Sequence, residues 1–137
     1  IGFALGPVGR FLYTRLGFRL WPLEPQPCKA GITVSEKYVL VRQYSPANFK
    51  YIEIWNMFCN LSHNLGVVAL FLLVASLYRI FILGYQNLAL IGLAAGAVVL
   101  FLIFLHRAVV FRTWALNDLN ATVDLVVQSG DGKAGAD

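Results

Sequence analysis

Two long apolar runs, residues 65–83 and 88–105, dominate the hydrophobic pattern of the chain, and the four residues Gly84-Tyr85-Gln86-Asn87 separate them. The first run contains one charged residue, Arg79, and the second contains none. As a helix rising about 1.5 Å per residue, each run is about 27–29 Å long, close to the roughly 30 Å hydrocarbon thickness of a bilayer. The pattern therefore predicts an all-α integral membrane protein built on a transmembrane helical hairpin.

Both helices are expected to continue past the apolar runs as long cytoplasmic extensions. Ser45-Pro46 is a typical helix start, and no proline follows it before the end of the first run. Beyond the second run, residues 106–128 contain no glycine or proline, and Ser129-Gly130-Asp131-Gly132 is expected to end the helix. The hairpin is thus predicted over residues 46–128, followed by a disordered tail at 129–137.

Two shorter segments precede the hairpin. Residues 1–23 mix arginine with aromatic and aliphatic residues, which is typical of a segment in the lipid headgroup layer or of the stub of an earlier membrane helix. Residues 24–45 form a connector that begins rich in proline and then fits either a strand or a short helix. We favour the helix, with Ser35 as its N-cap and Glu36 in its first turn, because a lone strand would leave its edges unpaired.

Composition and charge placement support a membrane location. The chain is 58% hydrophobic and 13% charged, whereas soluble domains are about 45–50% apolar and about 25% charged. Seven cations precede the first apolar run at residue 65 and three follow the second run at residue 105, while the short loop has none. The positive-inside rule then places both ends of a multi-pass chain in the cytoplasm, with the loop outside a bacterial-type inner membrane. Cys28 and Cys59 would both lie on the reducing side.

Several side chains are candidates for contact with lipid or with other helices. Guanidinium groups near the membrane surface suit lipid headgroups, and Arg79 is close enough to the loop for its side chain to reach the interface. The candidate headgroup contacts are Arg10, Arg15, Arg19, Arg79 and Arg107. Gly92 and Gly96 have the small-xxx-small spacing that lets two helices approach closely. We expect lipid, further copies or other membrane subunits as partners, and no nucleic acid.

A polar stripe is predicted at the same height on both helices. If Leu83 and Leu88 face each other, paired residue numbers add up to about 171, which sets His63 level with about Ala108. The stripe could be solvated or hydrogen-bonded between the helices, could line a path within a ring of copies, or could hold a metal or catalytic site with Glu53 or Asp118. The candidates are Asn56, Asn60, His63, His106, Thr113, Asn117 and Asn120.

We favour the first of these interpretations. A metal or catalytic site is least expected, because Glu53 stands about 15 Å from His63 along a helix and no catalytic or cofactor motif is present. We therefore do not expect the chain to be an enzyme, and we expect it to need no cofactor or metal. The sequence predicts a small subunit that assembles or scaffolds a larger membrane complex through helix packing. A pore-forming or membrane-perturbing oligomer and a membrane enzyme acting on lipid are the alternatives.

Overall fold

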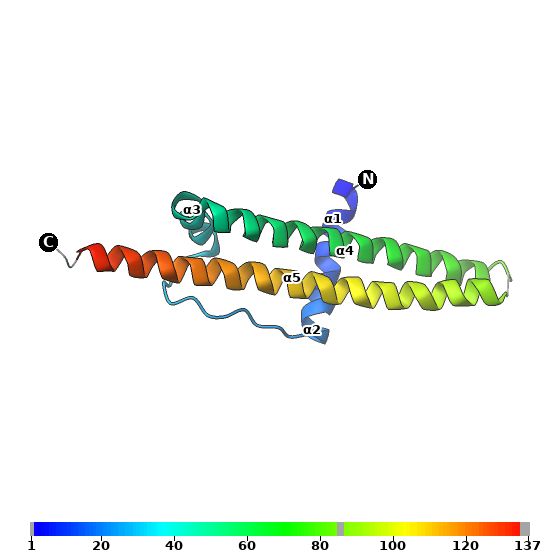
Figure 1. Cartoon of the computed structure of the whole chain (residues 1–137). Helices are drawn as coiled ribbons and strands as arrows, with labels where there is room; N and C mark the ends of the chain where they lie inside the picture. Colours follow the sequence, from blue (N-terminus) through cyan, green and yellow to red (C-terminus); the bar gives the residue numbers. More distant parts are fainter. Residues whose placement is uncertain (1, 85–86, 135–137) are drawn as a thin grey trace. The chain divides into compact units, whose positions relative to one another are not determined.

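The computed structural model describes residues 2–84 and 87–134, and each element within them is helical (Figure 1). Two long helices, α4 (Pro46–Phe81) and α5 (Leu88–Ala134), pack as a hairpin. Both are long and apolar enough to cross a membrane, as judged by length and composition. The predicted all-α class and the hairpin are thereby confirmed.

Local signals fix the ends of the two long helices. The predicted start of α4 is confirmed, because the Ser45 carbonyl accepts from the Phe49 N–H at 3.0 Å. Gly84 takes a positive φ of 68° just after α4, a conformation that glycine adopts without steric cost. The Asn87 side chain caps α5 by accepting from the Leu90 N–H at 2.7 Å. The loop residues 85–86 lie outside the described residues.

The chain divides into two compact units, and each contains a stretch of both long helices. Unit 1 comprises Ile1–Pro22 and Phe58–Val110. It includes α1 (Gly2–Leu12), a π-helical turn (Tyr13–Gly17) and the short α2 (Phe18–Leu20). Unit 2 comprises Leu23–Met57 and Phe111–Asp137, and it contains the connector and α3 (Val34–Tyr44).

Contacts inside each unit confirm the predicted antiparallel pairing. In unit 1, Gly66 lies against Phe104, where the loop geometry predicts residue 105 as its partner. In unit 2, Asn48 bonds to Thr122, next to the predicted residue 123. Trp55 packs edge-on to Trp114, with ring centroids 5.0 Å apart, within two residues of the prediction. Two antiparallel helices joined by a short loop have little freedom in register, which explains the agreement.

Each unit has its own buried apolar residues. Many of the buried side chains of unit 1 are small, and its buried residues include Val67, Ala69, Ala94, Ala97 and Leu105. In unit 2, α3 adds Val41 to a core cluster whose other members are Ile52, Ala115, Leu119 and Val123. The connector thus contains a helix, as predicted, and it spans Val34–Tyr44.

Two predicted helix ends differ from the structure. The N-cap of α3 is Thr33, not Ser35, because Thr33 and Glu36 bond to each other's backbone N–H in a capping box. Helix α5 continues to Ala134, where a disordered tail was expected from residue 129. Glycine lowers helix propensity by about 1 kcal/mol but keeps its backbone N–H, so it does not force an end as proline does. Residues 135–137 lie outside the described residues.

Candidate functional site

The N-terminal segment of unit 1, residues 2–21, crosses the two long helices (Figure 1). Three residues spaced by four, Gly9, Tyr13 and Gly17, are buried on its inner face. A Cβ at Gly9 would lie 2.5 Å from Nδ1 of His63, and one at Gly17 would lie 2.8 Å from Cγ2 of Val109. Glycine therefore lets the backbone of this segment touch both α4 and α5.

Aromatic contacts fix the same crossing. The Tyr13 ring stacks on the His63 ring with centroids 5.6 Å apart and planes 2° apart. At the other end of the segment, Trp21 packs edge-on to His106, with centroids 5.1 Å apart. The two predicted polar residues His63 and His106 thus both contact the N-terminal segment. They stand beside the ends of the predicted spans, at Leu65 and Leu105.

His63 is 5% exposed, and its Nε2 lies 3.2 Å from Oδ1 of Asn60, which is itself exposed. Nδ1 of His63 and Oδ1 of Asn64 are buried and make no hydrogen bond within the described part of the chain. Burial lowers the pKa of the His63 imidazole, and the positive charge of Arg10 acts in the same direction. Oδ1 of Asn64, which would accept from a charged ring, opposes this shift.

The five arginines that are candidates for lipid contact are all exposed, and their contact with headgroups stays a prediction. Arg10, Arg15 and Arg19 lie on the crossing segment, and Arg107 lies on α5 at the same level. Arg15 places its guanidinium 5.8 Å from the centre of the Phe11 ring. Arg79 occupies the last turn of α4, where a cation is favoured by the free carbonyl groups.

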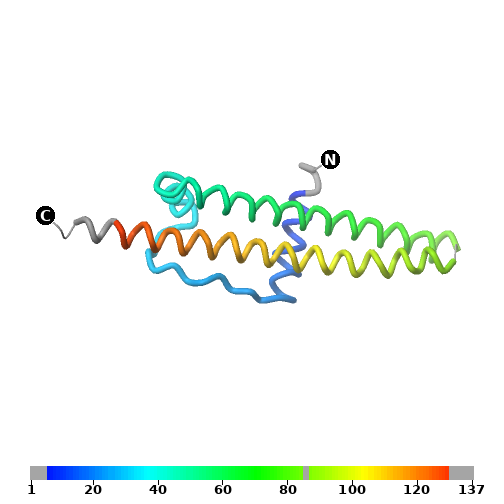
Figure 2. The backbone as a smooth tube through the Cα atoms, in the orientation of Figure 1, coloured from blue at the N-terminus to red at the C-terminus, as the bar shows by residue number. Residues whose placement is uncertain are grey.

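In unit 2, the connector runs beside α5 (Figure 2), and polar side chains of α5 bind its backbone. Oδ1 of Asn117 accepts from the Gln26 N–H at 2.8 Å, and Nδ2 of Asn120 donates to the Gln26 carbonyl at 2.6 Å. One turn further, Oδ1 of Asp124 accepts from the Lys29 N–H at 3.0 Å and from Sγ of Cys28 at 3.3 Å. These side chains satisfy backbone groups of a segment that has no secondary structure of its own.

Asn56 links three helices of unit 2. Its Nδ2 donates to the hydroxyl of Tyr38 at 2.7 Å, and its Oδ1 accepts from Arg112 at 3.0 Å. Asn120 also accepts from Nζ of Lys37 at 2.8 Å, which ties α3 to α5. Thr113 is buried. The side-chain amides of Asn56, Asn117 and Asn120 thus each bond to other elements of unit 2.

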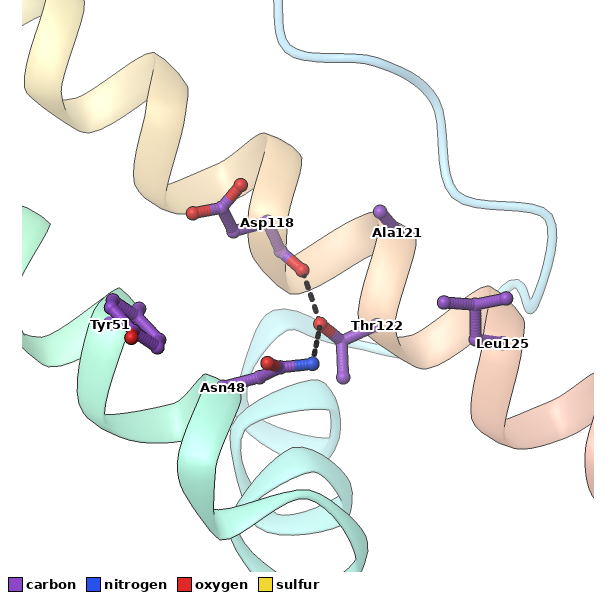
Figure 3. A pocket seen from close by; sticks show the side chains of 6 residues that line it. All are labelled: Asn48, Tyr51, Asp118, Ala121, Thr122 and Leu125. Atoms are coloured by element: carbon purple, nitrogen blue, oxygen red, sulfur yellow. Dashed lines mark hydrogen bonds between the residues drawn. The ribbon is translucent and has the colours of Figure 1, made fainter.

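A hollow lined from α4 and α5 lies in unit 2 (Figure 3). On one wall, Nδ2 of Asn48 reaches Oγ1 of Thr122 at 3.5 Å, and this hydroxyl donates to the Asp118 carbonyl at 2.7 Å. The Asp118 carboxylate accepts from Nε1 of Trp55 at 2.8 Å. The lining residues are Asn48, Tyr51, Asp118, Ala121, Thr122 and Leu125. Its polar atoms mainly bond the helices to one another.

Gly92 and Gly96 lie on the outer side of α5, away from Ala94 and Ala97 in the seam. A Cβ built on either glycine meets no described atom within 4 Å. Close packing inside the hairpin is therefore provided by the two alanines. The glycine face is open, so a helix-packing role for it concerns another chain and stays a prediction.

Two contact sets were missed from sequence. The Gly9, Tyr13 and Gly17 repeat carried a readable signal in its spacing of four, but the binding of the connector backbone to Asn117, Asn120 and Asp124 carried none.

Within residues 2–84 and 87–134, no three His, Cys, Asp or Glu side chains are placed to hold a metal ion. The chain matches no protein-family model, and comparisons with curated proteins and with solved structures gave no match.

Proposed function

We propose that this chain is a small integral membrane subunit that assembles a larger membrane complex through helix packing. The observation that carries the proposal is the exposure of its most apolar helices. Only 28% of the most apolar window of α4 and 17% of that of α5 are buried. Soluble proteins rarely leave apolar surface of this extent uncovered. Lipid and partner helices are the surroundings that suit it.

The outer face of α5 supports packing against another helix in the bilayer. Gly92 and Gly96 form a strip without side chains and with open space above it, and the nearby side chains of Leu93 and Val99 are 50% and 56% exposed. Small residues spaced by four allow a second helix to approach closely, which increases van der Waals contact where the hydrophobic effect between helices is weak. A helix of a second copy or of another subunit fits this strip.

The polar groups favour this proposal over the alternatives. A pore needs amides that face a lumen, whereas Asn56, Asn117 and Asn120 bond within unit 2. An enzyme acting on lipid needs a nucleophile or base beside a binding site, and the hollow of Figure 3 offers an Asp118 carboxylate already bonded to Trp55. The described contacts of these side chains are structural.

The proposal is tested by placing large side chains on the Gly92 and Gly96 strip. Gly92→Leu with Gly96→Leu should reduce association about tenfold or more, since overpacking a close contact costs about 1–3 kcal/mol. Association is measured by cross-linking in membranes and by native mass of the complex purified in mild detergent. Ala75→Leu is the matched control, because Ala75 is a small exposed residue on α4.

Two outcomes would contradict the proposal. Unchanged association of the double variant would show that α5 does not pack through this strip, and equal loss in the Ala75→Leu control would show a nonspecific effect of bulk. A closed ring of copies whose ion conductance is removed by Asn60→Leu would instead favour the pore.

A further inference from the structure

We infer that the crossing segment of unit 1 binds the phosphate groups of anionic lipids through Arg10, Arg15 and Arg19, with Arg107 beside it. This inference rests on the proposed membrane location and adds a ligand class to it. The first support is the charge of the unit. Its five charged residues are all arginine, and the sequence places every Asp and Glu of the chain outside Ile1–Pro22 and Phe58–Val110. The arginines therefore have no acidic partner within their own unit.

The second support is the place where the segment is held. Gly9 and Tyr13 fix it on α4 at His63, while Gly17 fixes it on α5 at Leu105 and Val109. Both contacts lie within about one helical turn of the ends of the predicted spans, at Leu65 on α4 and at Leu105 on α5. A helical segment that crosses the hairpin at this level runs along the bilayer surface when the hairpin spans the bilayer. Its exposed side chains then meet headgroups.

The third support is the mixture of exposed side chains on the segment. Phe11, Leu16 and Leu20 are 60%, 41% and 55% exposed, and they alternate with the exposed arginines. Interfacial helices combine apolar side chains that enter the acyl boundary with cations that stay at the phosphates. The placement of Arg15 near the Phe11 ring keeps a guanidinium beside an aromatic group that suits the same layer.

The use of arginine alone points to phosphate as the ligand group. A guanidinium presents a planar fork of donors that binds two phosphate oxygens at once, whereas an ammonium is a point charge. Unit 2 carries four lysines and two arginines, so the preference for arginine is confined to unit 1. Anionic phospholipids such as phosphatidylglycerol provide such phosphates at high local concentration, and their negative surface attracts the cluster.

The experiment compares lipids bound to the purified full chain by native mass spectrometry, with phosphatidylglycerol and phosphatidylcholine supplied at equal concentration. We expect a preference for phosphatidylglycerol that falls about fivefold for each arginine replaced by glutamine, and on the order of 100-fold for Arg10→Gln, Arg15→Gln and Arg19→Gln together. Arg10→Lys, Arg15→Lys and Arg19→Lys together should keep part of the preference. The matched control, Lys29→Gln, Arg42→Gln and Lys50→Gln, removes three exposed cations from unit 2 and should keep all of it.

Three results would overturn the inference: equal binding of both lipids by the unaltered chain, equal loss in the unit 2 control, or a preference that high salt does not weaken. The salt measurement uses the unaltered chain, so it holds even if the arginine variants fold poorly. Resistance to carbonate extraction from vesicles is measured in parallel. A chain that fails to insert contradicts the proposed membrane function, whereas one that inserts without lipid preference contradicts only this inference.

Discussion

Gly9, Gly17 and Gly6 share the N-terminal segment but differ in what surrounds them. A Cβ at Gly9 would meet Nδ1 of His63 at 2.5 Å and the His63 carbonyl oxygen at 2.9 Å, so backbone as well as side chain would have to move. At Gly17 the obstacle is a methyl group of Val109 at 2.8 Å, and at Gly6 nothing lies within 4 Å. The same residue type is thus required at one position and replaceable at another.

We therefore predict a graded response to alanine at these three positions. Gly9→Ala should destabilise the docked segment by about 1–3 kcal/mol and Gly17→Ala by less, because a side chain yields more easily than backbone. Gly6→Ala should be neutral or stabilising by up to about 1 kcal/mol, since alanine favours helix. Thermal unfolding of the three variants and of the unaltered chain measures the effect. Equal effects at Gly6 and Gly9 would contradict the close contact.

At the scale of single elements, α3 shows how a cap is chosen among nearby candidates. The Thr33 N–H and hydroxyl both donate to Oε2 of Glu36 at 2.7 Å, and the Glu36 N–H faces the Thr33 hydroxyl at 3.4 Å. These bonds to Thr33 lower the pKa of the Glu36 carboxyl. Ser35, the cap predicted from sequence, lies within the first turn of the helix instead.

The prediction at this scale separates the two candidate caps. Thr33→Ala should cost about 1 kcal/mol of stability in α3, because it removes the acceptor of the Glu36 N–H, whereas Ser35→Ala should have little effect. Because the folded pKa of Glu36 is lowered, its contribution is complete above the ordinary value of 4.5 and is lost as pH falls through the folded value. Hydrogen exchange of α3 amides, at neutral and acidic pH, measures both effects. A larger loss with Ser35→Ala would restore the original assignment.

The difference between local signals and contacts of distant segments explains how much of the fold and of the candidate site the sequence could predict. The two long apolar helices, the start at Pro46 and the register near Gly66 follow from hydropathy, capping and a short loop, which are local properties. The crossing of α4 by Gly9 and the binding of the connector by Asn120 depend on segments far apart in the chain. A polar stripe on a helix has the same sequence pattern whether it faces water, a lumen or its own connector, so its role could not be chosen in advance.

At the scale of the whole molecule, the placement of charge can be tested against membrane topology. Cations are frequent in residues 1–50, and the loop between the apolar runs has none. Because cationic loops stay in the cytoplasm, a spanning hairpin should expose its loop outside and both of its extensions inside. Each helix is long enough by itself to span a bilayer. The orientation of the hairpin in the membrane therefore tests the proposed topology more sharply than helix length does.

Single cysteines test this orientation. In a Cys28→Ser background, where the remaining Cys59 is only 4% exposed, Leu88→Cys should react with a membrane-impermeant maleimide added to intact cells. Ser35→Cys should react only after the membrane is permeabilised. Both positions are exposed, so a difference in labelling reports the side of the membrane and not burial. The background chain measures residual reaction of Cys59. Labelling of both cysteines in intact cells would rule out the hairpin topology, because the loop and the connector would then share one side of the bilayer.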